Sequence, residues 1–250
     1  MKLSIVTTIS AVVCLTCLSA FGSERQSSGA AVKKTYLSEI RDQLKVKWPS
    51  NRTINIVCHG HSVPAGYFKT PVVDTFSAYP HLLHRQLKKR YPFSVINVIV
   101  TSIGGETSDR GAGRFEKDVL SLKPDIVTID YALNDRRIGL KKAKESWEEM
   151  IKSAKDQGVK IILLTPTGDT RSELDQPSDP LNQHAEQIRQ LSKDYHVALA
   201  DSLAAFKAYD RGKGQLKDLM SQANHPNRAG HDLVVEELLQ WFPENQHPKK

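Results

Sequence analysis

The chain is poor in cysteine, with only three among 250 residues. Two of them, Cys14 and Cys17, lie in an apolar N-terminal segment that we expect to be removed, which leaves Cys58 alone. A single cysteine cannot form a disulfide within the chain, so a small cross-linked scaffold is excluded. The folded part must rely on a hydrophobic core, and about 228 residues are enough to build one.

The sequence also lacks a concentrated basic region. Its formal net charge is +7 at pH 7, but lysine and arginine are scattered along the chain, with only short clusters such as Lys88-Lys89-Arg90. Proteins that bind nucleic acids more typically gather these residues on one face or in an arm, and no recognition motif accompanies the charge. We therefore expect no nucleic-acid partner.

Charged residues are almost absent from the N-terminus. Residues 1–22 carry one charge, Lys2, and end in Ala20-Phe21-Gly22, with small residues at the two positions that a signal peptidase reads. This pattern predicts a signal peptide over 1–22, followed by a Ser/Gly/Ala-rich flexible leader over 23–33 and one folded domain over 34–250. An uncleaved membrane anchor is the alternative, since the apolar run is nearly long enough to span a bilayer. Serine and threonine interrupt the run, so we expect an exported protein, periplasmic or extracellular, with no stable membrane partner after signal cleavage.

Short apolar runs alternate with helical patterns through the rest of the chain. The runs expected to be strands cover residues 53–58, 94–101, 125–130, 159–165 and 196–201. Helices are expected over residues 34–47, 76–90, 114–122, 140–157, 181–194, 202–209 and 229–241. Continuous apolar runs are typical of strands that are covered on both faces. The order predicts an α/β fold in which helices cover both sides of one five-stranded parallel sheet.

Candidate catalytic residues follow the expected strands, at the edge where such sheets bind ligands. Ser62 follows the first strand, Gly105 the second and Asn134 the third, and His225 precedes the last helix. A serine hydroxyl is a poor nucleophile until a base, usually a histidine from another segment, removes its proton. Attack on an ester places negative charge on the carbonyl oxygen, which needs hydrogen-bond donors already in position. The Ser62 and Gly105 backbone N–H groups and the Asn134 amide are candidates for this oxyanion hole.

In their order, these segments resemble the motifs of the SGNH (GDSL-like) hydrolase family of esterases. The matching segments are Gly60-His61-Ser62, Gly105 to Ser108, Ala132 to Asp135, and Gln222 to His225 with its following Pro-Asn-x-x-Gly-His. The resemblance covers residues 53–239 and implies a three-layer α/β/α, flavodoxin-like fold. It implies Ser62 as nucleophile, His225 as base, and Gly105 and Asn134 in the oxyanion hole.

The same resemblance implies ester hydrolysis through an acyl-enzyme, with no cofactor and no metal. The expected substrate is a small-molecule or glycan ester with a short acyl chain, such as an O-acetyl group on carbohydrate. The segment 166–180 is polar and acidic, without an apolar lid-like stretch, which argues against a lipase.

The chain departs from the family at two positions near these residues. His61 replaces an aspartate, and Gln222 replaces the carboxylate that usually orients the histidine. An amide can hold one imidazole tautomer, but it does not stabilise imidazolium as a carboxylate does. The orienting group of His225 could therefore be Gln222, a backbone carbonyl, or another carboxylate, for which Asp201 and Asp218 are the candidates.

Two further residues are candidates for substrate binding. Tyr67 could stack on a sugar ring, and Arg136 could bind an acidic group of the substrate, although an arginine there could also be ordinary solvated surface.

Two other function classes stay open. Gln222 and His61 would also suit an SGNH-fold binding module whose catalytic site has decayed. The His59-x-His61 pair, with His81 and His84, would suit a metal-dependent hydrolase. Barrels that carry such a pair need eight strands, and five are expected here.

Overall fold

The computed structural model describes residues 31–243. The expected signal peptide (1–22) and all but the last three residues of the expected leader (23–33) lie outside the described residues.

The centre of the fold is a five-stranded parallel sheet with the strand order β2-β1-β3-β4-β5. The strands are β1 (Thr53–Gly60), β2 (Val95–Val100), β3 (Ile126–Asp130), β4 (Lys160–Leu164) and β5 (Ala198–Ala200). β2 pairs with one edge of β1, and β3, which follows β2 in the chain, pairs with the opposite edge of β1. This reversal leaves a crevice at the carboxyl ends of β1 and β3, which is where flavodoxin-like sheets bind ligands. The predicted parallel sheet and α/β class are confirmed.

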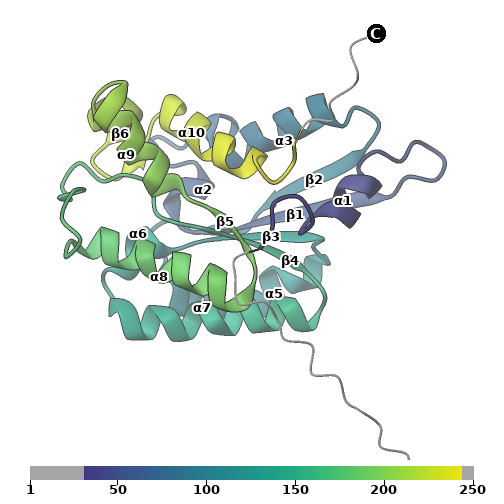
Figure 1. Cartoon of the computed structure of the whole chain (residues 1–250), viewed down its shortest axis with the longest axis horizontal. Coiled ribbons are helices and arrows are strands. Elements are labelled where there is room, and N and C mark those ends of the chain that lie inside the picture. The colour runs from purple at the N-terminus through teal and green to yellow at the C-terminus, as the bar shows by residue number, and fades with distance from the viewer. Residues whose placement is uncertain (1–30, 244–250) are drawn as a thin grey trace, which may run out of the picture.

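Helices cover both faces of the sheet, as Figure 1 shows, with α3, α9 and α10 above it and α5, α7 and α8 below it. The longer helices are α3 (Tyr79–Arg90), α7 (Gly139–Asp156), α8 (Pro180–Tyr195), α9 (Ser202–Gly212) and α10 (Arg228–Leu239). The shorter ones are α1 (Ser38–Gln43), α2 (Ser62–Ala65), α4 (Ser108–Gly113), α5 (Phe115–Asp118) and α6 (Ala132–Asp135). Three 3-10 turns span Thr75–Ser77, Leu120–Leu122 and Leu216–Leu219. A small antiparallel pair, β6 (Met220–Gln222) and β7 (His225–Pro226), precedes α10.

The strands are buried on both faces because their side chains point alternately into two hydrophobic clusters. In β1, Ile56 and Cys58 belong to the cluster with α3 and α10, whereas Val57 belongs to the cluster with α5 and α7. This two-sided burial explains why the strands are continuous apolar runs in the sequence.

The expected helices differ from the observed ones mainly at their ends. The helix expected over 34–47 is observed as the shorter α1, which is followed by its C-cap residue Leu44. The helix expected over 114–122 divides into α5 and a 3-10 turn. The end predicted for α7 is confirmed to within one residue, because the helix ends at Asp156, and Gly158 follows the C-cap Gln157 with φ +73°. Between residues 31 and 243, no helix combines the length and apolar character needed to cross a membrane.

Candidate active site

The turn after β1 presents Ser62 at the carboxyl edge of the sheet, as the first residue of α2. The turn needs Gly60, since a Cβ there would lie 2.5 Å from the Asp130 carbonyl oxygen of the neighbouring strand. His61 caps α2, because its Nδ1 accepts a hydrogen bond of 3.1 Å from the Val63 N–H. Aspartate can cap a helix in the same way, because its side chain also accepts hydrogen bonds from backbone N–H groups.

Ser62 and His225, which lie 163 residues apart in the chain, meet in the structure. The distance from His225 Nε2 to Ser62 Oγ is 2.9 Å. Each residue is 6% exposed, so the pair is sheltered yet reachable from solvent. The contact has the geometry in which an imidazole takes a hydroxyl proton.

The other imidazole nitrogen of His225 has two neighbours. The Phe68 carbonyl oxygen lies 2.8 Å from Nδ1, and the Gln222 amide nitrogen also lies 2.8 Å from it. Gln222 Oε1 accepts a 3.0 Å hydrogen bond from the Thr70 N–H, which turns the amide's NH₂ group toward the histidine. A carbonyl oxygen can only accept, so Phe68 favours the tautomer with the proton on Nδ1 and the lone pair on Nε2. The Gln222 NH₂ group can only donate, so by itself it would favour an Nδ1 without a proton. The tautomer that can accept the Ser62 proton needs an acceptor at Nδ1, and of the two neighbours only the Phe68 carbonyl is one.

The two alternative carboxylates are occupied elsewhere. Asp201 caps α9 and accepts hydrogen bonds from Thr165 Oγ1 at 2.9 Å and Arg189 Nε at 2.7 Å. Asp218 accepts a 2.9 Å hydrogen bond from the Gln215 N–H and helps to cap a 3-10 turn. Within the described residues neither carboxylate bonds to His225, so of the alternatives left open by the sequence these two are not the orienting group.

The three expected oxyanion donors lie on neighbouring segments. Gly105 has φ +74°, and a Cβ there would meet nothing within 4 Å, so its loop is open toward solvent. Asn134 Nδ2 donates a 2.9 Å hydrogen bond to the Glu106 carbonyl, which fixes the amide and leaves its second N–H unused. In residues 31–243 no acceptor is bonded to the N–H of Ser62 or Gly105. These donors are therefore available to a developing oxyanion.

A buried polar network, which the sequence did not reveal, supports the loop that carries Gly105. The Glu106 carboxylate, 4% exposed as a residue, accepts hydrogen bonds from Arg114 Nε at 2.9 Å and from the Tyr131 hydroxyl at 2.8 Å. His59 Nε2 lies 3.0 Å from the same hydroxyl. Burial lowers the pKa of His59 to about 4, so it stays neutral within the network. A satisfied buried network of this kind rigidifies the backbone it holds.

A second anchor joins the same loop to the helix that carries Asn134. Asp135 is fully buried and accepts hydrogen bonds from the Ser108 N–H at 2.8 Å and from Trp147 Nε1 at 2.7 Å. The sequence signal for Glu106 and Asp135 is their place in the two family-like segments, where they directly follow the oxyanion candidates.

The histidines that suggested a metal site have separate partners. His61 Nδ1 accepts from a backbone N–H, so its proton resides on Nε2, which faces Asp130 Oδ1 at 3.3 Å. His59 belongs to the Tyr131 network, and His81 packs its ring against Phe76 with centroids 5.2 Å apart. Across the described part of the chain, no three or more His, Cys, Asp or Glu side chains are grouped so that they could hold a metal ion.

The two expected substrate-binding residues both lie beside the catalytic candidates. The Tyr67 ring is half-buried, 6.1 Å from the His225 ring, and it covers Gly104, where a Cβ would lie 2.9 Å from the tyrosine. Arg136 follows α6 and donates to Asp169 Oδ2 at 2.8 Å and to the Leu133 carbonyl at 2.9 Å.

Comparison with known families agrees with this geometry. The sequence matches the model of the GDSL-like Lipase/Acylhydrolase family over residues 58–233. The chain belongs to this family. All four expected family residues of this SGNH hydrolase fall within the matched region.

Its relatives are carbohydrate esterases. An acetylxylan esterase from Geobacillus stearothermophilus is 26% identical over 170 residues, which cover 61% of this chain and 75% of that protein. The solved structure of an acetylxylan esterase from the same organism has a TM-score of 0.66 and 21% identity, covering 79% of this chain and 95% of that one. A two-domain esterase active on acetylated mannans has a TM-score of 0.66 and 20% identity, covering 86% of this chain and 57% of that one. This SGNH hydrolase is therefore a carboxylic-ester hydrolase.

The surroundings of His225 predict the pH at which this SGNH hydrolase loses activity. Burial lowers the pKa of His225 below 6.5, and the Phe68 carbonyl opposes the shift while His61 and Arg171 add to it. A base must be unprotonated to accept a proton, so activity should fall only when the pH drops through this lowered pKa. The profile of kcat/KM against pH, measured on an uncharged aryl acetate, should have the midpoint of its acid limb below 6.5. A midpoint above 6.5 would contradict the arrangement.

The Phe68 contact also predicts the effect of restoring the missing carboxylate. Gln222→Asp should change kcat/KM on a short-chain ester by less than about tenfold, or about 1.4 kcal/mol of barrier, because the carbonyl already holds the Nδ1 proton. Asp201→Asn and Asp218→Asn serve as controls and should leave kcat/KM within about twofold, since both act away from His225. A hundredfold or greater rise in Gln222→Asp would instead identify a hydrolase weakened by its glutamine.

Proposed function

We propose that the protein is an exported serine esterase that removes short acyl groups, chiefly acetyl, from carbohydrate. Ser62 is the nucleophile and His225 the base, and the Ser62 and Gly105 N–H groups with the Asn134 amide bind the oxyanion. The observation that carries the mechanism is the 2.9 Å contact between Ser62 Oγ and His225 Nε2, with the Phe68 carbonyl 2.8 Å from Nδ1.

The reaction proceeds in two halves. Ser62 Oγ attacks the ester carbonyl carbon while its proton passes to His225 Nε2, and the oxyanion forms against the three donors. The tetrahedral intermediate collapses, the C–O bond to the alcohol breaks, and His225 returns the proton to the departing oxygen. Water then attacks the acyl-enzyme by the same route and releases the acid and free Ser62. The imidazolium that forms in each half is stabilised by the Phe68 carbonyl dipole, which replaces a full negative charge.

Three observations support an acetylated carbohydrate as the substrate. The relatives with matching sequence and fold are described as esterases of acetylated xylan or mannan. Tyr67 offers an aromatic ring beside His225, as a sugar face requires, and segment 166–180 has no apolar stretch that could cover a long acyl chain.

The substrate proposal is tested by comparing acetylated xylooligosaccharides with aryl esters of increasing acyl length. We expect acetate release from the oligosaccharides, and a fall in kcat/KM of at least about tenfold from acetyl to octanoyl aryl esters, because segment 166–180 offers no apolar stretch to cover the added methylenes. Faster turnover of the octanoyl ester, with no acetate released from the oligosaccharide, would identify a lipase-like enzyme instead.

Export is proposed from the N-terminal sequence alone. N-terminal sequencing of the protein recovered outside the cytoplasm should give a start near Ser23. A chain beginning at Met1 in the membrane fraction would mean that the segment serves as an anchor.

A further inference from the structure

A hollow of about 510 Å³ opens beside the proposed oxyanion hole. It is lined by Leu133, Asn134, Arg136, Arg137, Arg171, Pro180 and Asn224. Asn134 is one of the proposed oxyanion donors, and Asn224 directly precedes the proposed base. A substrate whose ester is held by Asn134 therefore has this hollow directly beside it for another of its groups.

The hollow carries more positive charge than its surroundings neutralise. Arg136 and Arg171 share one carboxylate, Asp169, which is fully buried. Both Asp169 oxygens are occupied, since Oδ1 accepts from the Arg171 N–H and Nε, and Oδ2 accepts from both guanidinium groups. One carboxylate thus pairs with two guanidinium groups, which leaves one net positive charge.

Arg137 adds a further unbalanced charge. Its guanidinium donates to two backbone carbonyls, those of Asn134 and Gly105, and it forms no ion pair within residues 31–243. No acidic residue lines the hollow. Two net positive charges therefore face it, directly beside Asn134.

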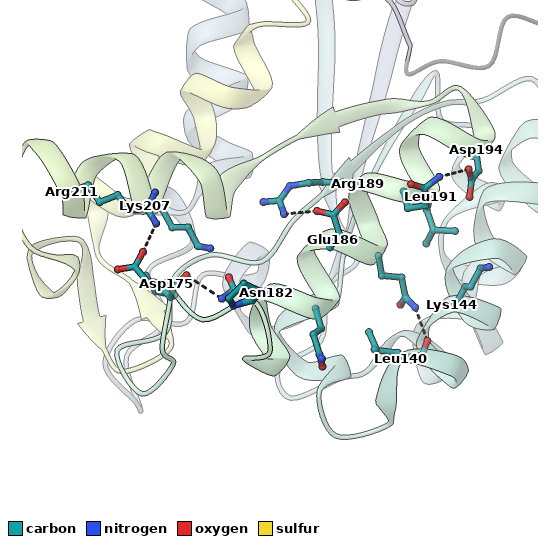
Figure 2. A pocket seen from close by; sticks show the side chains of 15 residues that line it. Leu140, Lys144, Asp175, Asn182, Glu186, Arg189, Leu191, Asp194, Lys207 and Arg211 are labelled. Carbon is teal, nitrogen blue, oxygen red and sulfur yellow. Dashed lines mark hydrogen bonds and ion pairs between the residues drawn. The ribbon is translucent and has the colours of Figure 1, made fainter.

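A larger groove elsewhere shows the opposite arrangement. Figure 2 shows this groove of about 710 Å³, formed by α7, α8, α9 and the segment before α8, with no proposed catalytic residue in its lining. Its arginines are paired with acidic residues of the same groove, Arg211 with Asp175 and Arg189 with Glu186. The arginines of this groove are thus balanced within its own lining, whereas the lining of the 510 Å³ hollow has three arginines and no acidic residue.

The position of Arg171 is fixed relative to the catalytic histidine. The Thr170 N–H donates a 2.8 Å hydrogen bond to the Ala223 carbonyl, which joins the loop of Arg171 to the segment that ends in His225. The buried Asp169 holds the Arg171 guanidinium through two hydrogen bonds, yet the Arg171 side chain remains 62% exposed. A held and accessible guanidinium loses little conformational freedom when it binds an anion.

We propose that this hollow binds an anionic group of the substrate, a carboxylate or a sulfate on the sugar that carries the acetyl ester. The inference rests on the proposed carbohydrate esterase function and makes it specific for acidic glycans. Arginine presents paired N–H donors that match the geometry of such oxyanions, and charge-assisted hydrogen bonds of this kind are the strong ones.

The test uses three acetyl esters that differ at one position of the sugar. The substrates are a mono-O-acetylated methyl glucoside, the corresponding methyl glucuronoside and the corresponding 6-O-sulfated methyl glucoside, with an aryl acetate as a reference. We expect kcat/KM to be at least about tenfold higher for the uronate ester, the sulfate ester or both than for the neutral glucoside, and the preference to shrink as salt screens the charges. The two charged substrates distinguish a carboxylate from a sulfate.

The arginines are tested by the ratio of charged to neutral substrate turnover. Arg137→Gln and Arg171→Gln should each lower this ratio several-fold, whereas Arg171→Lys, which keeps the charge, should retain part of it. Arg137→Gln leaves the Asp169 ion pairs intact, so a folding defect in Arg171→Gln would not leave the inference untested. Arg85→Gln removes an exposed positive charge from α3, outside the hollow, and should leave the ratio unchanged.

Each remaining outcome overturns the inference in a distinguishable way. Equal turnover of the three sugar esters would overturn the anion site and leave the proposed carbohydrate esterase standing. Cleavage of the aryl acetate without cleavage of any sugar ester would overturn both. A preference for the charged esters that survives both glutamine variants would show that another surface recognises the anion.

Discussion

Ser62→Ala should lower kcat on a short-chain aryl ester by at least about 10⁴-fold, because no other group in the proposed mechanism can form the acyl-enzyme. The residual rate should come only from the oxyanion donors and substrate binding, which remain in the variant. The fold should survive, since the side chain of Ser62 contributes a single hydrogen bond, the one to His225. Steady-state kinetics together with circular dichroism would separate loss of chemistry from loss of structure.

The matched control for this variant is Ser38→Ala. The Ser38 hydroxyl bonds only to the Thr35 carbonyl at the start of α1, far in the chain from the site. It should leave kcat unchanged within about twofold. Wild-type turnover by Ser62→Ala would exclude the serine mechanism.

Asn134→Ala should have the second largest effect, a loss of about 10²- to 10³-fold in kcat with little change in KM, equal to about 2.7–4 kcal/mol of transition-state stabilisation. The oxyanion is present only in the transition state, so a donor aimed at it should affect kcat more than binding. The amide is held at 2.9 Å from the Glu106 carbonyl, and this carbonyl belongs to the loop that Arg114 and Tyr131 anchor. The donor is therefore already oriented before the substrate arrives.

Asn134→Asp separates the loss of the N–H donor from a change in the size of the side chain. Aspartate has nearly the same size but offers no N–H when ionised, so it should lose at least as much activity as alanine. Asn97→Ala serves as a control, because Asn97 bonds to Asn55 across β1 and β2 at the other end of the sheet. An Asn134→Asp variant with wild-type kcat would remove Asn134 from the oxyanion hole.

The sequence predicts the frame of the site well, because the frame depends on local patterns. Continuous apolar runs identify the five strands, and the positions directly after them contain Ser62, Gly105 and Asn134. Parallel strands bring their carboxyl ends to one edge, so the order of these residues in the chain already implies that they meet. The pairing with His225 follows from the family resemblance, and the structure brings the two side chains within hydrogen-bond distance.

The parts that sequence could not predict depend on the backbone or on contacts between distant segments. A carbonyl oxygen has no residue-type signature, so the role of Phe68 became visible only from its position 2.8 Å from His225 Nδ1. The ion pair of the buried Glu106 with the half-buried Arg114 looks like two ordinary surface charges in the sequence. The sequence indicates Arg136 as a candidate, but the charge balance around Asp169 depends on how the loop before α8 folds.

The central claim, that Ser62 is the nucleophile and His225 activates it, is tested most directly by covalent labelling. The protein is treated with a fluorophosphonate, which reacts with activated serines, and the site of modification is located by peptide mass spectrometry. We expect one adduct per chain, on Ser62, appearing in step with the loss of esterase activity, absent in Ser62→Ala and strongly slowed in His225→Ala. Full labelling of Ser62→Ala, or esterase activity that persists after Ser62 is completely modified, would contradict the claim.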